Sequence, residues 1–559
     1  MALDDGSGAS AGSVGRGDDL VSWGLAVALV APSLIWVMKD RSVWSWDPAF
    51  YAMDTLDLWG RLLAHQHGAW LERMQTIYSA KAPGVGWLGQ FFVPLGRWLG
   101  SIELGLLLSI LATQAATLGL LHRVCKMLAP ARPAVAVVGT VMVGGSPLFI
   151  AMSHHFLTEA LQLFSVVYLL WVVAGSDSRT PLRTALHLVL ALALGAIAKI
   201  STPAFVLLPA GLGAARLVRA ARRKHAFSRP VAADAAWGLV TLLTLGLGGA
   251  WYLRNGRASY AFDSLATSSE VALDYGHRGP LLAKASYWLG AIGRALFVPP
   301  VAWLFAGLMA VGLVVVVARR RAEQEEQGRP AADHALTLAA VLQVVLVVGL
   351  MSASINEETR YLLPLAPMLA LALAWLLASL RSRRHAVAAL AVFVVQWAVV
   401  QGRQLGLVPA ANATYWEKRP EDGALKMREL ERVVARTCNA ETAGKWSMVG
   451  VDFDWLNHYT LAFYANKAAL ERGYHCYYQY LGHAPRDADA AYRRIAEVQA
   501  PFFISVAESA LPQPPDFLNR VAAQVLRRAE GDPAFVRVPF ESVSGVVLLE
   551  HPGAWREPR

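Results

Sequence analysis

The sequence predicts a polytopic α-helical membrane protein with about eleven spanning helices and a C-terminal soluble α/β domain. The 559-residue chain is 55% hydrophobic and only 16% charged, with a mean hydropathy of +0.38. This composition is too apolar for a soluble globule of that length. Many of its apolar runs approach the roughly 20 residues that a spanning helix requires. No such run occurs after residue 401, where the pattern of the chain changes.

Residues 1–20 are rich in Gly, Ser and Asp, which predicts a disordered cytoplasmic tail. Residues 21–401 form the predicted membrane domain. Its weakest pair of spans flanks Lys199, where a polar break leaves two short apolar stretches, so a single re-entrant segment is the alternative there. The predicted spans are 21–38, 102–121, 134–152, 158–174, 185–200, 202–218, 232–253, 295–318, 335–352, 361–380 and 385–401.

The distribution of basic residues predicts the orientation. If the N-terminus is cytoplasmic, the short inner loops hold about 18 Lys and Arg residues, whereas the much longer outer segments hold about 13. The formal charge of +10 therefore follows mainly from membrane topology. The basic residues are dispersed between spans, so a nucleic-acid partner is excluded as the explanation.

The first outer loop carries acidic residues at helical spacing. Asp47, Tyr51, Asp54 and Leu58 follow an i, i+4, i+7, i+11 pattern, which predicts an amphipathic helix at the membrane surface. We interpret Asp54 and Asp57 as members of a solvated interfacial face. Asp47 differs because it lies close to the end of the first span. A carboxylate near hydrocarbon is costly, so Asp47 is a candidate site residue.

Two cations are candidate phosphate ligands. Lys81 stands beside Pro83 and Gly84 in the same loop and suits a phosphate at headgroup depth; snorkelling at the membrane edge is the alternative. Arg360 opens a late span from the outer side and could bind a phosphate through two parallel hydrogen bonds. Its alternative is an ion pair with the neighbouring Glu357 or Glu358.

A short outer turn adds Glu159, next to Thr158 at the first turn of a helix, where capping is the alternative role. His154 and His155 precede it. Adjacent histidines point to different sides, and no further ligands of suitable spacing accompany them. The sequence therefore predicts neither a metal site nor a cofactor. A divalent metal bound by these histidines is the alternative.

After residue 401, charged helical stretches alternate with short β-like runs, among them WSMVGVDF, PFFISVA and VSGVVLLEH. This pattern predicts that residues 402–559 form a soluble α/β domain. An odd number of spans would place the domain outside, where Cys438 and Cys476 could form a disulfide. Two unpaired thiols are the alternative.

Together these motifs resemble the GT-C glycosyltransferases of the protein O-mannosyltransferase, lipid A aminoarabinose transferase and RgtA-like kind. The matching features are Asp47 with Tyr51, then YSAKAPGVGWL, HHFLTEA and TRYLLPLAP, in this order over residues 20–400. Two positions depart from the family pattern. Pro48 stands where a second acidic residue is common, and the usual Lys-Pro-Pro is Lys81-Ala82-Pro83.

The resemblance implies an enzyme that transfers a sugar from a polyprenyl-phosphate donor to a glycan, lipid or protein acceptor at the outer face of a bacterial inner membrane. Asp47 would be the base, its proton affinity raised by partial desolvation. Glu159 would orient acceptor or sugar, and Lys81 and Arg360 would offset the phosphate charge. A ligase of the O-antigen type and a transporter are the alternatives. The further residues expected to contact substrate are Tyr51, His154, His155, Glu357 and Tyr361.

Overall fold

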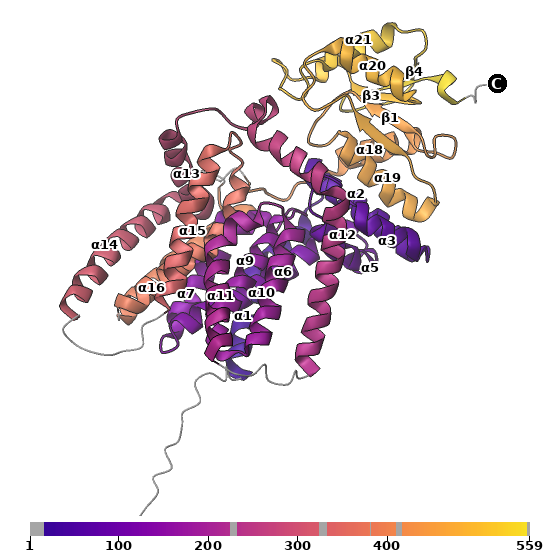
Figure 1. The fold of residues 1–559 in the computed structure, drawn as a ribbon. Coiled ribbons are helices and arrows are strands. Elements are labelled where there is room, and N and C mark those ends of the chain that lie inside the picture. Colours follow the sequence, from indigo (N-terminus) through magenta and orange to yellow (C-terminus); the bar gives the residue numbers. More distant parts are fainter. Residues whose placement is uncertain (1–15, 224–231, 324–332, 381, 410–415, 556–559) are drawn as a thin grey trace, which may run out of the picture.

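The computed structural model describes residues 16–223, 232–323, 333–380, 382–409 and 416–555. A bundle of long helices forms the larger part, and a small sheet domain sits on one end of it, which we call the domain end (Figure 1). Most of the predicted tail, residues 1–15, lies outside the described residues. The first helix begins at Arg16, five residues before the predicted start of the first span.

The bundle confirms the polytopic helical fold. Its helices are α1 (Arg16–Lys39), α6 (Ile102–Leu128), α7 (Pro133–Gly144), α8 (Pro147–Met152), α9 (Glu159–Ala174), α10 (Pro181–Ala198), α11 (Thr202–Arg223), α12 (Ala232–Ser268), α13 (Leu281–Leu296), α14 (Pro299–Glu323), α15 (His334–Ala353), α16 (Ala366–Leu380) and α17 (Arg383–Gln404). Short 3-10 helices interrupt the connections: η2 (Ser176–Ser178), η3 (Glu270–Tyr275) and η4 (Thr359–Leu365).

Within the described residues, eight helices are long and apolar enough to cross a membrane, or nine if the bent pair α13–α14 is one span. The helices α7 and α9 are apolar but shorter. All eleven predicted runs therefore lie on apolar helices, although fewer than eleven helices pass the length criterion. The re-entrant alternative near Lys199 is wrong, because α10 and α11 are separate helices of 18 and 22 residues.

Local sequence explains where α10 begins and ends. The Thr180 hydroxyl accepts a hydrogen bond from the Arg183 N–H, and Pro181 occupies the first helical position, where its missing N–H leaves no bond unmade. At the other end the backbone of Lys199 is extended (φ −161°, ψ 135°), and α11 starts three residues later. The polar break in the sequence is thus a sharp turn between two antiparallel helices.

The first long loop folds into short helices at the domain end: α2 (Trp46–Leu63), α3 (His67–Thr76), α4 (Gly84–Gly89), η1 (Gln90–Phe92) and α5 (Val93–Trp98). The predicted amphipathic helix is α2, whose buried residues include Tyr51, Asp54 and Leu58. Asp54 is not solvated as predicted, because Arg73 Nη2 on α3 lies 2.6 Å from Asp54 Oδ1. Asp57 pairs with the same arginine at 2.6 Å.

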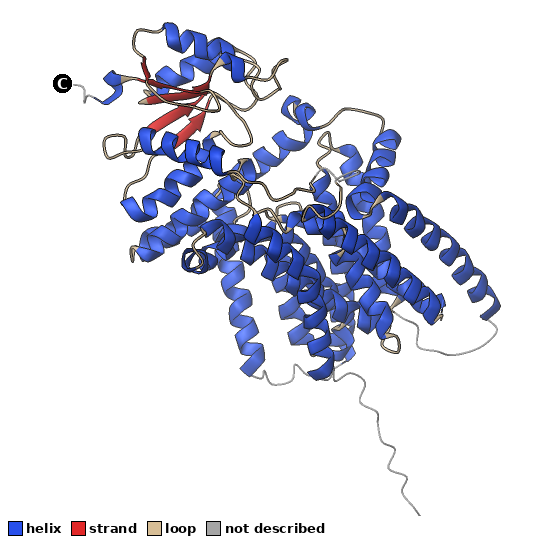
Figure 2. Cartoon of the chain, turned by 180° about the vertical axis from the view of Figure 1, so that it is seen from behind, coloured by secondary structure: helices blue, strands red, loops and turns tan. Residues whose placement is uncertain are grey.

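The C-terminal domain contains a five-stranded sheet with helices around it (Figure 2). The strand order is β2-β1-β3-β5-β4, with β1 parallel to β2 and β3, and β5 antiparallel to β3 and β4. The strands are β1 (Trp446–Val449), β2 (Tyr477–Tyr480), β3 (Phe502–Val506), β4 (Val536–Val538) and β5 (Val546–Glu550). The helices are α18 (Ala424–Thr437), α19 (His458–Arg472), α20 (Ala488–Val498), η5 (Glu508–Ala510), α21 (Ala522–Gly531) and η6 (Pro552–Trp555).

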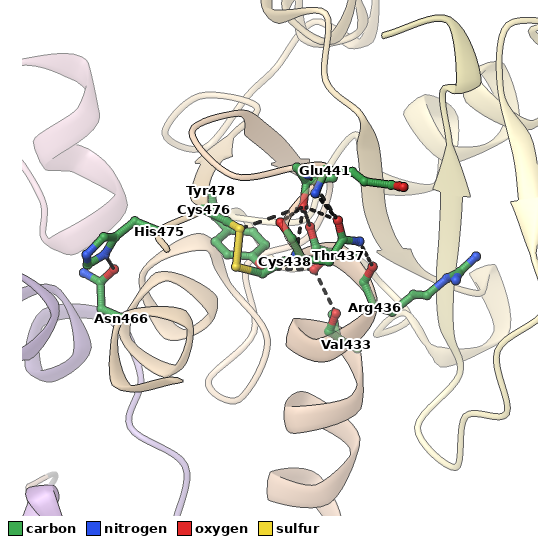
Figure 3. The surroundings of a disulfide bond; sticks show 11 residues. Val433, Arg436, Thr437, Cys438, Glu441, Asn466, His475, Cys476 and Tyr478 are labelled. Atoms are coloured by element: carbon green, nitrogen blue, oxygen red, sulfur yellow. Dashed lines mark hydrogen bonds between the residues drawn. A yellow bond between two sulfur atoms is a disulfide. The ribbon is translucent and has the colours of Figure 1, made fainter. Parts of the chain in front are cut away.

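This domain contains a disulfide between Cys438 and Cys476, whose Cα atoms are 5.5 Å apart (Figure 3). The bridge joins the end of α18 to the residue before β2, so the predicted pairing is present. Beside it, the hydroxyls of Thr437 and Tyr478 are hydrogen-bonded at 2.8 Å. A cross-link over 38 residues stabilises the fold by restricting the unfolded chain.

The C-terminal domain docks onto the first loop mainly through α19, which packs against α2. One continuous cluster of buried apolar residues extends from the bundle into the domain. Polar contacts cross the same boundary: Lys467 Nζ lies 2.7 Å from Glu103 Oε1, and the Trp36 indole donates to the Lys418 carbonyl at 2.9 Å. The domain therefore covers the end of the bundle at which the predicted site residues lie.

Candidate active site

Five charged side chains from five separate segments meet at the domain end of the bundle. Two are carboxylates, Asp47 at the start of α2 and Glu159 at the start of α9. Three are cations, Lys81 before α4, Lys199 between α10 and α11, and Arg360 in η4. Together they form one ion-paired network with a net charge of +1, so an anion is the ligand expected to bind it.

Asp47 uses both of its carboxylate oxygens in this network. Lys81 Nζ donates to Oδ1 at 2.5 Å, and Arg360 Nη2 donates to Oδ2 at 2.8 Å. Burial would raise the pKa of Asp47, but the charges and hydrogen bonds of Lys81 and Arg360 outweigh it and hold that pKa below its usual range. The predicted rise in proton affinity is therefore wrong for the protein without substrate.

Glu159 is almost fully buried and pairs with two cations. Lys199 Nζ donates to Glu159 Oε1 at 2.7 Å, and Arg360 Nε lies 3.4 Å from the same oxygen. Arg360 thus bridges the two carboxylates, 313 residues from one and 201 from the other in sequence. The predicted alternative, an ion pair of Arg360 with Glu357 or Glu358, is not the arrangement observed.

Lys81 is held inside the site rather than extended toward water. Its Nζ lies 5.0 Å from the centre of the Phe50 ring and 5.4 Å from those of Tyr51 and Phe262. An ammonium among ring faces is attracted by their negative quadrupoles. With the Asp47 ion pair, this placement argues against snorkelling, in which the charged group would reach the membrane–water boundary.

The turn before Lys81 is shaped by its contacts with α2. Tyr78 and Ser79 have positive φ angles of 64° and 35°, which are uncommon for residues with side chains. The Tyr78 hydroxyl donates to the Tyr51 carbonyl at 2.7 Å, and the Tyr78 N–H donates to Asp54 Oδ2 at 3.3 Å. Asp54 therefore has a structural role, since it anchors the turn that carries Lys81.

Lys199 belongs to the network, although it was not among the predicted site residues. Besides pairing with Glu159, its Nζ lies 4.0 Å from the centre of the Tyr361 ring. The signal was present in the sequence as a lysine in a short polar break between two apolar runs. A largely enclosed lysine at the junction of two spans is costly unless it has a partner. That partner, Glu159, lies 40 residues earlier.

The other predicted site residues lie around the network. Tyr361 and Tyr51 face its cations, whereas His154 stacks on Trp36 with ring centres 3.8 Å apart. His155 meets the Trp416 ring edge-on at 5.4 Å. Burial, together with the charges of Lys418 and Arg360, lowers the pKa of His155 to about 3, so this imidazole is neutral.

Glu357 belongs to a separate contact group. His277 Nδ1 lies 2.9 Å and Lys284 Nζ 3.5 Å from its carboxylate oxygens. Lys284 also donates to the carbonyls of Ser354 and Ile355, so Lys284 ties down the segment that leads into η4. Among the residues that the structure describes, no group of three or more His, Cys, Asp or Glu side chains is arranged to hold a metal ion.

Comparison with solved structures identifies the fold of this multi-pass membrane protein as GT-C. The chain is similar to ArnT from Cupriavidus metallidurans bound to undecaprenyl phosphate, with a TM-score of 0.57 at 14% identity over 96% of this chain and 99% of ArnT. The same ArnT in the apo state gives a TM-score of 0.54 at 12% identity, covering 96% and 100%.

A third similar structure is the Archaeoglobus fulgidus oligosaccharyltransferase in complex with Zn and sulfate, with a TM-score of 0.51 at 11% identity over 95% of this chain and 73% of that one. No protein-family model matches the sequence, and no curated protein matches it. At these identities the likeness establishes the fold, and the chemistry must be argued from the site itself.

Proposed function

We propose that this protein transfers a sugar from a polyprenyl-phosphate donor to a glycan, lipid or protein acceptor on the side of the membrane that carries the C-terminal domain. The observation that carries this proposal is the bridge from Lys81 and Arg360 to Asp47. It brings a carboxylate that would act as the base within hydrogen-bond distance of two cations that would bind the phosphate. Direct displacement of a phosphate leaving group requires that combination.

The ion pairs suggest how donor binding would prepare the base. Both cations on Asp47 are also the groups suited to a phosphate, so the donor would compete with the carboxylate for them. When Lys81 or Arg360 turns to the phosphate, Asp47 loses part of the charge that holds its pKa low. Its proton affinity then rises as the acceptor enters, which is the property a base needs.

The proposed reaction is a single displacement with inversion. The acceptor hydroxyl or amine gives its proton to Asp47 while its oxygen or nitrogen forms a bond to the anomeric carbon. The bond from that carbon to the phosphate oxygen breaks, and polyprenyl phosphate leaves with its charge offset by Lys81 and Arg360. Glu159 and Lys199 lie next to Arg360 and would orient the sugar or acceptor.

Two further observations support the proposal. The similar ArnT structure is a complex with undecaprenyl phosphate, so a protein of this fold binds a polyprenyl phosphate. The predicted topology also fits, because basic residues gather in the loops that would face the cytoplasm. The C-terminal domain and the network would then face the periplasm, and the protein would be located in the inner membrane.

The test replaces Asp47 with asparagine in purified protein reconstituted with undecaprenyl-phosphate sugars. Asp47→Asn keeps the shape and removes the base, so sugar transfer should fall by about two to four orders of magnitude, while undecaprenyl phosphate still binds. Asp57→Asn is the matched control on the same helix, since Asp57 contacts Arg61 and Arg73 outside the network. Near-normal transfer by Asp47→Asn would exclude Asp47 as the base.

A further inference from the structure

The residue before Asp47 has an unusual backbone conformation. Trp46 has a φ of 39°, in the left-handed region that bulky L residues rarely adopt. Such a conformation persists where surrounding contacts over-determine it. Pro48 follows Asp47 and restricts the chain on the other side. The backbone that aims Asp47 at its cations is therefore constrained from both directions.

The contact that holds Trp46 comes from the C-terminal domain. The Trp46 indole N–H donates to Asp452 Oδ1 at 2.7 Å, across 406 residues of sequence. A hydrogen bond from an N–H to a carboxylate is stronger than one to a neutral acceptor. Since Trp46 is 41% exposed, little packing fixes its position, and this hydrogen bond is the specific restraint.

Asp452 is itself firmly placed. It lies just beyond the carboxyl end of β1, a strand with parallel neighbours on both sides. The Asp452 N–H donates to Asn519 Oδ1 at 2.8 Å, and Asn519 is buried. The neighbouring Trp44 is bonded to the same domain, because its carbonyl accepts from the Thr460 hydroxyl at 2.9 Å. The segment leading to Asp47 is thus attached to the domain at two points.

The geometry points to Asp452 as a positioning residue for the transfer reaction: through the Trp46 indole, the C-terminal domain sets the orientation of the Asp47 carboxylate. This inference rests on the proposed function for its kinetic consequence. It also gives the domain a part in catalysis that is separate from acceptor binding. A misplacement of about 1 Å at a reacting group can lower the rate by about 10²-fold.

The test compares three substitutions in the full-length protein. Asp452→Ala removes the acceptor and Trp46→Phe removes the N–H but keeps a ring; each should lower kcat about 10- to 100-fold with a donor KM within about twofold of the parent. The double variant should be no worse than the poorer single one, because both break the same bond. Asp452→Asn keeps an oxygen acceptor and should restore most of kcat.

The matched control is Lys467→Met, which breaks another contact between the domain and the bundle without touching residues 44–47. It should leave kcat near the parent value. Additive losses in the double variant, or full activity in Trp46→Phe, would overturn the inference. A ring that served only as a platform for a sugar would give the second result.

Hydrogen–deuterium exchange gives a readout that needs no activity. In Asp452→Ala and Trp46→Phe, peptides that cover residues 44–50 should exchange faster than in the parent, while α9 peptides remain protected. Lys467→Met should show no change at residues 44–50. Unchanged exchange in both Asp452→Ala and Trp46→Phe would refute the inference even if transfer were lost. Faster exchange in a protein with no transferase activity would instead refute only the proposed function.

Discussion

Removing the Lys81 ammonium should weaken donor binding, but only moderately, because Lys81 is already paired with Asp47 in the parent protein. Lys81→Met keeps most of the aliphatic stem among Phe50 and Tyr51 but leaves Asp47 with Arg360 as its remaining cation. In the parent, Lys81 Nζ already has a partner 2.5 Å away. When a phosphate binds, the Lys81 ammonium therefore exchanges the Asp47 carboxylate for the phosphate and gains no hydrogen bond that it lacked before.

This exchange sets the magnitude. A hydrogen bond to a charged group contributes roughly 1.5–3 kcal/mol. Because Lys81 gives up its contact with Asp47 in order to bind the phosphate, we expect Lys81→Met to lose binding free energy in the lower part of that range, about 1.5–2 kcal/mol. This loss raises the Kd for the donor about 10- to 30-fold. Lys81→Arg should recover only part of the loss, since a planar fork does not replace a compact ammonium.

The assay is binding of undecaprenyl phosphate to the purified protein in nanodiscs, measured by native mass spectrometry across a lipid titration. Lys467→Met is the control, because it removes a lysine at the same end of the bundle that contacts Glu103 rather than the network. A Kd for Lys81→Met equal to that of the parent would refute the assignment of Lys81 to the phosphate. The phosphate would then have to bind elsewhere.

Three further outcomes are expected. The kcat/KM of the parent should hold down to pH values below the usual aspartate pKa of about 3.9, because Lys81 and Arg360 lower the pKa of Asp47 against the effect of burial. Lys81→Met should raise that pKa, so its kcat/KM should begin to fall at a higher pH than that of the parent. Acid-side profiles that coincide for the parent and Lys81→Met would contradict this. Glu159→Gln should lower transfer less than Asp47→Asn, measured with the same donor, and a larger loss would reverse their assigned roles. Reporter fusions at Gly402 and near Arg223 should report opposite compartments, and the same compartment for both would overturn the topology.

The membrane architecture was predictable from the sequence alone. Spanning helices require long apolar runs whatever their neighbours are, so each of the eleven runs could be recognised locally. Charges near the ends of those runs predicted Asp47, Glu159 and Arg360 as site residues, because a charged group near hydrocarbon is costly. Lys81 was predicted from its place in the first outer loop, beside Pro83 and Gly84. The β-like runs likewise predicted strands β1, β3 and β5.

Which charges pair with one another was not predictable from the sequence. Arg360 could have paired with its neighbours Glu357 or Glu358, and local sequence does not distinguish these partners from Asp47, 313 residues away. The same holds for Lys199 with Glu159 and for Asp54, which the helical pattern placed in solvent and Arg73 holds inside. Ion pairs form between groups that the packing of helices brings together, and their energies depend on burial. The lowered pKa of Asp47 and its link to Asp452 through Trp46 therefore exist only in the assembled fold.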